Sequence, residues 1–358
     1  MESRSSLPSA PTRPSTSLVK TAISNRAPIS RILTPRTHTG QASCIYSIGM
    51  LGGIEAGGTK FICGVGTGPD DLVKSQFPTT TPEETLEQVI AFFRSNGGRN
   101  LEAIGIGSFG PVDLDPASQT YGFITSTPKA GWANFDLAGT VARALRVPVG
   151  FDTDVNAALL GEWRWGAAQG LANVIYLTIG TGVGGGVMVH GQVVHGLVHP
   201  EIGHLRLPHD TAIDPFPGTC PFHKDCLEGL ASGPAIEKRW GVKATALPQD
   251  HRAWELEAHY LAVALANLTL TLSPQRILLG GGVMQQPHLF KMIRAEFSWV
   301  LNGYVRHPDI LDHLDEYIQP PQLGGNAGLS GSLFLAAQEA ASAEFDHILK
   351  RHNQGGRA

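Results

Sequence analysis

The stretch of sequence that decides the fold is Thr178-Ile179-Gly180-Thr181-Gly182-Val183-Gly184-Gly185-Gly186, followed by Val187-Met188-Val189. Its glycines satisfy the G-x-G-x-x-G pattern, but a dinucleotide-binding turn opens a helix whose amino end holds the pyrophosphate. Here a strand-forming run follows the glycines, so the pattern predicts a hairpin over residues 174–189. The backbone N–H groups of such a glycine-rich turn can face an anion. We therefore predict a phosphate site at Thr181 and Gly182.

A second glycine turn lies upstream, at Glu55-Ala56-Gly57-Gly58-Thr59-Lys60, between two strands predicted within residues 54–66. A third cluster, Gly280-Gly281-Gly282, follows a strand predicted at 276–279 and precedes a predicted helix. One glycine hairpin is usually only a hairpin, but three clusters in one chain favour nucleotide binding. The phosphate-binding and nucleotide-binding residues predicted in these two clusters are Gly57, Gly58, Thr59, Lys60, Gly280, Gly281 and Gly282.

The remaining sequence alternates helices with short apolar strands. Helices are predicted at 82–95, 135–145, 154–165, 232–240, 252–272 and 327–342, and strands at 72–77, 103–107 and 147–151. A chain of 358 residues exceeds what one core usually holds, and the alternation predicts an α/β fold of two similar lobes with a cleft between them. We expect the first lobe at 49–152, completed by a C-terminal helix at 326–343, and the second at 153–325, with a metal loop at 199–230.

Composition excludes several classes of function. A formal net charge of −4 gives no general attraction to nucleic acid, and no apolar run is long enough to span a bilayer. The P-loop pattern G-x-x-x-x-G-K-[ST] is also missing from the sequence. Residues 1–48 are rich in Ser, Thr and Pro, so we expect a disordered tail there. Because Met50 directly precedes the first strand, a cytoplasmic location is favoured over a mitochondrial or other organelle-targeting peptide.

Asp154 lies in Asp152-Thr153-Asp154-Val155-Asn156, which follows a predicted strand and opens a predicted helix at the lobe junction. Its carboxylate could simply cap that helix, which is worth about 1 kcal/mol. Alternatively, it could accept the proton of a hydroxyl that attacks a phosphoryl group, since phosphoryl transfer needs a positioned base. The residues alone favour neither role over the other.

A short segment carries ligands suited to a metal ion. Cys220-Pro221-Phe222-His223-Lys224-Asp225-Cys226 has the spacing C-x₂-H-x₂-C, and a tetrahedral structural zinc site needs one further ligand. His204 lies upstream, but His195, His199 and His209 are alternatives that spacing does not exclude. No second pair of ligands or ββα unit follows, so a nucleic-acid zinc finger is not indicated.

Polar side chains elsewhere suit a sugar, which needs acceptors for its hydroxyls and a face for its ring. Glu201 and Glu228 supply carboxylates, and Asn134 supplies an amide. Trp132 is a possible platform for the sugar ring, within a stretch at 127–135 that is too polar and glycine-rich for a core element.

The three glycine clusters resemble, in order and spacing, the two phosphate motifs and the adenosine motif of ROK-family sugar kinases. The similarity extends from about residue 50 to about residue 340. It implies an actin-like ATPase fold, in which two ribonuclease-H-like lobes bind ATP in the cleft between them. Many members carry Asp where this chain has Glu55, but fructokinase-like members are similar to it there, and the longer carboxylate can still orient hydrated Mg²⁺.

The resemblance also implies roles for individual residues. Asp154 matches the base of the family's Asn-Asp-x-Asn element. The implied structural zinc ligands are His204, Cys220, His223 and Cys226, a set typical of the fructokinase branch. The implied sugar-binding residues are Gly107, Ser108, Asn134, Asn156, Glu201, His204 and Glu228.

The expected reaction is phosphorylation of D-fructose by ATP to D-fructose 6-phosphate, with Mg²⁺ on the phosphates and zinc beside the sugar. The expected partners are ATP and a hexose, in a homodimer, without nucleic acid or membrane. A kinase for mannose, glucose or an amino sugar is the alternative enzyme. A sugar-responsive regulator is disfavoured because the Pro-rich first 48 residues cannot form a helix-turn-helix, and a zinc-binding interaction module is disfavoured by the phosphate turns.

Overall fold

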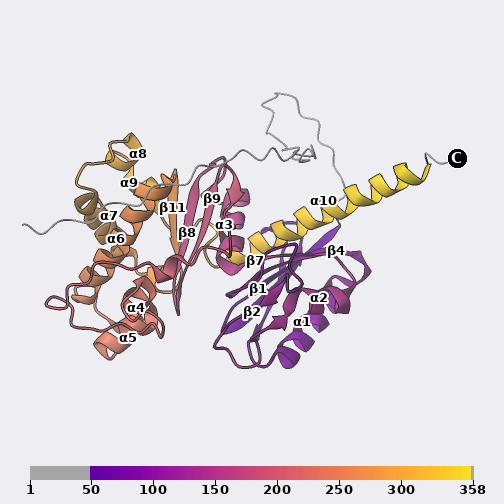
Figure 1. Cartoon of the computed structure of the whole chain (residues 1–358), viewed down its shortest axis with the longest axis horizontal. Coiled ribbons are helices and arrows are strands. Elements are labelled where there is room, and N and C mark those ends of the chain that lie inside the picture. The colour runs from indigo at the N-terminus through magenta and orange to yellow at the C-terminus, as the bar shows by residue number, and fades with distance from the viewer. Residues whose placement is uncertain (1–48, 356–358) are drawn as a thin grey trace, which may run out of the picture. The chain divides into compact units, whose positions relative to one another are not determined.

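The computed structural model describes the backbone of residues 49–355 and the side chains of residues 49–343 (Figure 1). The tail predicted at 1–48 lies outside the described residues. Most predicted elements are present, with shifts of a few residues at their ends.

The first of two five-stranded sheets has the order β3-β2-β1-β4-β7. Its strands are β1 (Met50–Ala56), β2 (Lys60–Gly66), β3 (Val73–Pro78), β4 (Leu101–Ser108) and β7 (Val149–Thr153). The first three strands are antiparallel, and β4 and β7 continue the sheet in parallel with β1.

The second sheet repeats this plan with the order β10-β9-β8-β11-β12. Its strands are β8 (Val174–Ile179), β9 (Val183–Val189), β10 (Gln192–Val193), β11 (Arg276–Gly280) and β12 (Ile318–Gln319). Again an antiparallel set comes first, and two strands then join in parallel. The hairpin predicted at 174–189 is confirmed as β8 and β9. Both sheets belong to one compact unit, so the lobe boundary expected near residue 152 stays a prediction.

Helices and short strands connect the sheets. The α-helices are α1 (Pro82–Asn96), α2 (Leu137–Leu145), α3 (Asp154–Trp165), α4 (Leu227–Ala231), α5 (Gly233–Trp240), α6 (Ala253–Leu272), α7 (Pro287–Leu301), α8 (Pro308–Leu311), α9 (Leu314–Tyr317) and α10 (Ala327–Gly355). The 3₁₀ turns are Gly98–Asn100, Ile202–His204, Ala244–Ala246, Val283–Gln285 and Gly324–Asn326, and a small hairpin pairs β5 (Phe123–Ile124) with β6 (Phe135–Asp136).

Three predicted helix boundaries were wrong. The helix expected from residue 135 begins at Leu137, because the two preceding residues form β6. The third glycine cluster does not open a helix directly, since a 3₁₀ turn at 283–285 precedes α7. The last helix continues to Gly355 rather than ending near residue 342, since residues 342–354 contain no glycine or proline that would end it.

Helix α10 packs on strands β1 and β4 of the first sheet and crosses α3. A Cβ atom added at Gly331 would collide with the backbone oxygen of Ala157, and one at Gly161 would collide with that of Ala327. The glycines therefore let the two helices approach more closely than side chains would permit. This crossing fixes α3, whose amino end carries Asp154, against both β4 and α10.

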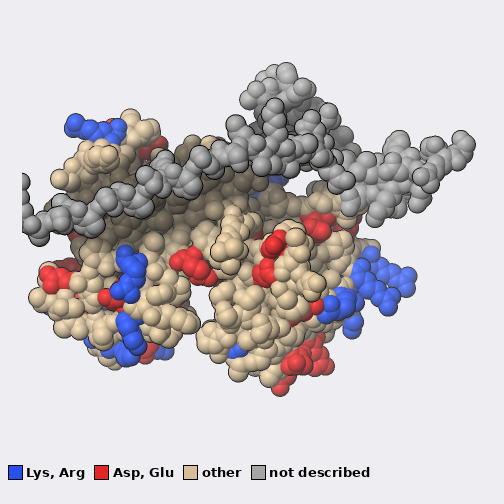
Figure 2. Space-filling view, in the orientation of Figure 1, with Lys and Arg blue, Asp and Glu red and all other residues tan. Residues whose placement is uncertain are grey.

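On the face shown in Figure 2, Lys, Arg, Asp and Glu side chains form small separate groups among uncharged residues. Among the helices of the described residues, none combines the length and the apolar composition needed to cross a membrane.

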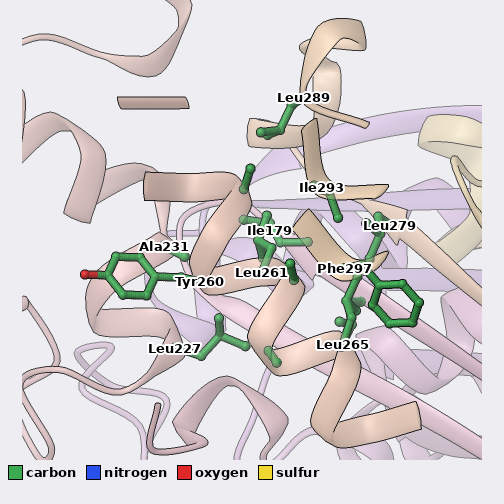
Figure 3. Close-up of a cluster of buried hydrophobic side chains, with 14 of the residues drawn as sticks. Ile179, Leu227, Ala231, Tyr260, Leu261, Leu265, Leu279, Leu289, Ile293 and Phe297 are labelled. Atoms are coloured by element: carbon green, nitrogen blue, oxygen red, sulfur yellow. The ribbon is translucent and has the colours of Figure 1, made fainter. Parts of the chain in front are cut away.

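The largest apolar core lies against the second sheet (Figure 3). Helices α6 and α7 contribute Leu261, Leu265, Ile293 and Phe297, which are fully buried. Burying such side chains stabilises a protein by about 1.5–3 kcal/mol each. The sheet strands that this core supports end at the second and third glycine clusters, so the core holds both clusters in place.

Candidate active site

A cavity of about 730 Å³ is lined by residues that follow or lie within both sheets. This is within the roughly 300–1,000 Å³ typical of ligand sites. Its polar and glycine lining residues are Glu55, Asp154, Tyr176, Thr178, Gly280, Gly281, Gln285, Arg294, Gly324, Gly325 and Gly328. The cavity thus brings together residues that the sequence analysis selected from three separate motifs.

Asp154 is the first residue of α3, but it does not cap the helix. Thr153 is the N-cap, and its Oγ1 accepts a hydrogen bond from the backbone N–H of Asn156 at 3.1 Å. The capping interpretation of Asp154 is therefore wrong. Burial, and to a smaller extent the charge of Glu55, raises the pKa of Asp154 from its ordinary value to about 7. A carboxyl group with a pKa near neutrality is suited to accepting a proton.

Glu55 lines the same cavity at the end of β1. Burial raises the pKa of Glu55, although the charge of Lys60 opposes this increase. Its Oε2 atom is buried and has no hydrogen-bond partner among the described residues. Buried carboxylate oxygens usually have a partner, and an oxygen ligand of this kind is what Mg²⁺ and its water shell bind. The residues at this position therefore fit a hydrated Mg²⁺.

The first glycine turn is a compact hairpin end. The N–H of Gly57 donates to the carbonyl oxygen of Lys60 at 3.0 Å. Thr79 fixes the turn from the side, since its Oγ1 donates to the Gly57 carbonyl at 2.7 Å and its N–H donates to the Thr59 carbonyl at 3.0 Å. The Lys60 ammonium group donates to Gln76 on β3 at 3.4 Å. The turn adjoins Glu55 in sequence but does not itself line the cavity.

The second glycine turn is bound by a carboxylate from another element. Glu228 accepts a hydrogen bond from the N–H of Val183 at 3.0 Å, and the N–H of Gly233 donates to the Gly180 carbonyl at 2.8 Å. A Cβ atom added at Gly182 would lie 2.6 Å from Oε2 of Glu228. Glu228, which was expected at the sugar, is therefore joined to the turn that carries Thr181.

The third glycine cluster forms part of the cavity wall through Gly280 and Gly281. Gly281 has φ +93°, and an added Cβ atom there would collide with the backbone of Ile179. Only glycine adopts this conformation readily. The backbone nitrogen of Gly282 lies 3.8 Å from the position of an added Cβ on Gly180, so the second and third clusters are adjacent.

Three of the predicted sugar residues gather at the amino end of α3. A Cβ atom added at Gly107 would lie 3.4 Å from Cα of Asp154, so β4 ends close beside this residue. Ser108 is fully buried, and its hydroxyl donates to the Phe109 carbonyl at 2.9 Å. Asn156 is buried and donates through Nδ2 to Oδ1 of Asp152 at 2.7 Å, while its Oδ1 has no described partner.

The four predicted zinc ligands also lie together. The ligand atoms of His204, Cys220, His223 and Cys226 are all within 4.8 Å of one another. Nδ1 of His204 is 3.7 Å from Sγ of Cys220 and 3.6 Å from Sγ of Cys226. Zn–S and Zn–N bonds of about 2.3 and about 2.0 Å in a tetrahedron hold such ligands about 3.5 Å apart. The donor set and its spacing therefore fit Zn²⁺.

The family model described as "ROK family" matches residues 51–339. The chain belongs to the ROK family. A Bacillus subtilis (strain 168) relative named "Putative fructokinase" is 52% identical over 303 residues, which cover 82% of this chain and 99% of that protein. The fructokinase of Lactococcus lactis subsp. cremoris is 43% identical over 287 residues, covering 80% of this chain and 96% of that protein.

Solved structures of ROK proteins confirm the predicted actin-like fold. A ROK hexokinase from Thermus thermophilus matches with a TM-score of 0.67 and 29% identity, covering 82% of this chain and 99% of the other. A ROK family glucokinase from Streptomyces griseus, in complex with glucose and AMPPNP, matches with a TM-score of 0.66 and 27% identity, covering 81% of this chain and 100% of the other.

One sugar residue of this ROK chain was assigned wrongly from the sequence. Trp132 cannot form a platform for a sugar, because its side chain is fully buried. Its ring packs against Phe61 and Phe109 at centroid distances of 5.3 and 5.8 Å, and its Nε1 donates to the Thr80 carbonyl at 2.8 Å. Asn134, two residues later, is exposed and has φ 56°.

The partners of three histidines in this ROK chain could not be predicted from the sequence. His195 lies 2.9 Å from Oδ2 of Asp152, and His209 contacts the Asp214 carbonyl at 2.9 Å. His199 accepts a hydrogen bond from the N–H of Val112 at 3.2 Å. Only their place in a histidine-rich segment signalled them, and that signal was attributed to zinc. Each partner is far away in the sequence or belongs to the backbone, so spacing could not reveal it.

Proposed function

We propose that this ROK chain is a fructokinase, which transfers the γ-phosphoryl group of ATP to D-fructose and forms D-fructose 6-phosphate and ADP. The observation that carries the proposal is Asp154, a carboxyl group with a pKa of about 7 in the wall of a nucleotide-sized cavity. Fructose is favoured because the relatives named fructokinase are 41–52% identical to the chain, whereas the glucokinase relatives are 27–28% identical.

In this reaction Asp154 accepts the proton of the attacking sugar hydroxyl while the oxygen forms a bond to the γ-phosphorus atom. The bond from that phosphorus to the bridging oxygen of ADP breaks. Gly107 lets β4 pack closely against α3 beside Asp154, because an added Cβ atom there would lie 2.5 Å from Cβ of Ala157. Removing a general base typically lowers a rate by about 10²- to 10⁴-fold.

The glycine clusters hold the nucleotide. In the first glycine turn, which Gly57 begins, the backbone N–H groups of Gly58 and Thr59 bind phosphate oxygens, assisted by the Lys60 ammonium group. Those of Thr181 and Gly182 do the same, and Gly280–Gly282 lie beside the nucleoside. Glu55 would hold hydrated Mg²⁺, and the ion would neutralise charge on the phosphates. The orphaned Oε2 atom of Glu55 supports this assignment.

Zinc has a structural role in this proposal. A site with four protein ligands is closed and leaves no position for a substrate. His204 is three residues after Glu201, and Cys226 is two residues before Glu228. The ion would therefore fix the segments that place both carboxylates near the sugar, with His204 contributing to both sites. Asn134, Asn156, Ser108 and Gly107 complete the sugar-binding set.

We further propose a homodimer, as the resemblance to the family implies. The exposed side chains of Trp299 and Tyr304, at the carboxyl end of α7 and just beyond it, offer apolar surface for such a contact. Light scattering of the purified protein measures its oligomeric state, and a monomeric mass at micromolar concentration would contradict the dimer.

The function is tested with a coupled assay of ADP release on fructose, glucose, mannose and N-acetylated hexosamines. Turnover is expected to be highest with fructose and to fall at least about 100-fold in Asp154→Asn. ATP affinity, measured by calorimetry, should stay within about threefold of the parent, because the base does not hold the nucleotide. Preference for another hexose would overturn the fructose assignment, and an active Asp154→Asn protein would overturn the base.

A further inference from the structure

The segment between β10 and the 3₁₀ turn at Ile202–His204 is joined to the first sheet by two histidines. Nε2 of His195 lies 2.9 Å from Oδ2 of Asp152, the fourth residue of β7. Nε2 of His199 accepts a hydrogen bond at 3.2 Å from the N–H of Val112, in the loop after β4. Glu201 lies two residues after His199 and directly before the 3₁₀ turn at Ile202–His204. Its backbone is therefore held on one side by His199 and on the other by this turn.

The position of the proton on His199 follows from this contact. Because the Val112 N–H donates to Nε2, that nitrogen must offer its lone pair, and the ring proton of neutral His199 is then on Nδ1. Nδ1 lies 3.5 Å from Oε1 of Glu201. A nitrogen that carries a proton therefore faces the carboxylate, as required for it to attract and orient that group.

His199 is also well placed sterically. Its side chain is 7% exposed, and its ring lies 3.5 Å from the position of an added Cβ on Gly110. The carboxylate of Glu201 is 44% exposed, and among the described residues its only close polar contact is His199. A buried, fixed ring thus holds a carboxylate that is otherwise free to turn in solvent.

We propose that His199 is a positioning residue, which orients the Glu201 carboxylate toward the hydroxyls of the hexose and connects it to the loop at 109–112. The proposal rests on the proposed function, because it takes Glu201 as a sugar ligand. This loop directly follows Ser108, the last residue of β4 and also assigned to the sugar, so His199 connects two segments that carry proposed sugar residues. Residues that lock the geometry of a binding group raise affinity by reducing the ordering cost of binding.

Two substitutions separate the two contacts of His199. In His199→Gln, the amide oxygen can occupy the place of Nε2 and accept from Val112, but no N–H faces Glu201. In His199→Asn, the amide nitrogen can occupy the place of Nδ1 and donate to Glu201, but Val112 loses its acceptor. We expect His199→Gln to raise KM for fructose roughly tenfold, with kcat and KM for ATP within about twofold of the parent.

His199→Asn should instead lower the melting temperature, because a buried N–H is left unpaired, while KM for fructose rises by less than about threefold. Glu201→Gln should raise KM by itself and add little to His199→Gln, because both act on one contact. His259→Gln is the matched control. Nδ1 of His259 on α6 lies 2.8 Å from Oε1 of Glu296 on α7, so the substitution also breaks a contact between a histidine and a carboxylate, but neither residue lines the cavity.

The proposal is overturned if His199→Gln leaves KM for fructose unchanged, or if both variants at position 199 raise it equally. A fall of kcat alone would also contradict a positioning role. If the parent phosphorylates another hexose better, the same variants are measured with that sugar. The fructose assignment of the proposed function then fails. The role of His199 is still decided by the KM of each variant relative to the KM of the parent for that sugar.

Discussion

Glu55 and Asp154 present their carboxyl groups to one cavity, and the negative charge of Glu55 raises the pKa of Asp154. The two groups come from different elements, β1 and α3, which meet beneath α10. Two carboxyl groups in a buried site each make ionisation of the other less favourable. This relationship links the base to the group that would hold Mg²⁺.

The pH dependence of turnover follows from this pair. Asp154 is raised to a pKa of about 7 and acts as a base only when ionised, so kcat/KM should rise as pH increases through about 7. Glu55→Gln removes a negative charge and should move this rising limb to lower pH. The measurement is kcat/KM from pH 5 to 9 at constant ionic strength. If kcat/KM of Glu55→Gln rises over the same pH range as that of the parent, the charge of Glu55 does not influence Asp154, however much the rate itself has fallen.

The raised pKa of Asp154 also makes the stability of the folded state depend on pH. Turnover should rise with pH, whereas the contribution of this group to stability should fall. Between about pH 4 and about pH 7 the folded state keeps a proton on Asp154 that the unfolded chain has lost, so this group reduces the stability of the folded state as pH rises. Asp154→Asn cannot ionise. The inactive variant should therefore unfold at a higher urea concentration than the parent at pH 8, and this advantage should shrink at pH 5.

Removal of the metal should lower stability and sugar affinity together. Cys220 and Cys226 are buried, and without a cation their loop loses the interaction that joins them to His204. Dialysis against a chelator is expected to lower the melting temperature and raise KM for fructose, and added Zn²⁺ should restore both. Elemental analysis of the purified protein should give one zinc per chain. Protein without zinc but with full activity would refute the structural role.

Much of the fold was predictable from sequence because its signals are local. The hairpin at β8 and β9 followed from strand-forming residues on both sides of a glycine turn, and α3 begins at Asp154 as expected. The metal ligands were recognisable because three of them lie within seven residues. Their fourth partner was left open by spacing, and only the fold brings His204, rather than His195, His199 or His209, to the cysteines.

The features that the sequence did not reveal are contacts between distant segments. Trp132 stands in a polar, glycine-rich stretch, but tertiary packing against Phe61 and Phe109 buries it. Glu228 is predicted to bind the sugar, and the sequence did not reveal that its carboxylate also accepts a hydrogen bond from the N–H of Val183, 45 residues away. A local pattern states which groups are available for a contact, but it does not state which partner the fold supplies.

Glu162 illustrates a buried charge that the backbone satisfies. Its carboxylate accepts hydrogen bonds from the N–H groups of Ala167, Gln322 and Leu323 at 2.8, 3.0 and 2.7 Å, and the side chain is fully buried. These bonds fix the loop before α10, which lines the cavity at Gly324 and Gly325. Replacing Glu162 by Ala leaves three donors without partners and should cost about 3 kcal/mol or more. Urea unfolding measures the loss.

Glu255→Ala is the control for that experiment, because Glu255 is exposed in the first turn of α6 and should change stability by less than about 0.5 kcal/mol. Equal losses in the two variants would contradict the role of Glu162 in fixing the loop.

The crossing of α3 and α10 gives the last prediction, because it tests what holds Asp154 in place. Gly331 meets the backbone of Ala157 so closely that even a methyl group collides. Gly331→Ala must separate the helices, and overpacking of this kind typically costs about 1–3 kcal/mol. Since α3 carries Asp154 at its amino end, kcat should fall as well, although Gly331 does not line the cavity.

Gly68→Ala is the matched control, since an added Cβ there meets no atom within 4 Å. It should leave both urea unfolding and kcat within experimental error. If Gly331→Ala loses stability but keeps the full kcat, the crossing supports the fold without setting the position of the base. If it loses neither, α3 and α10 can separate freely, and the close glycine contact is not required for either property.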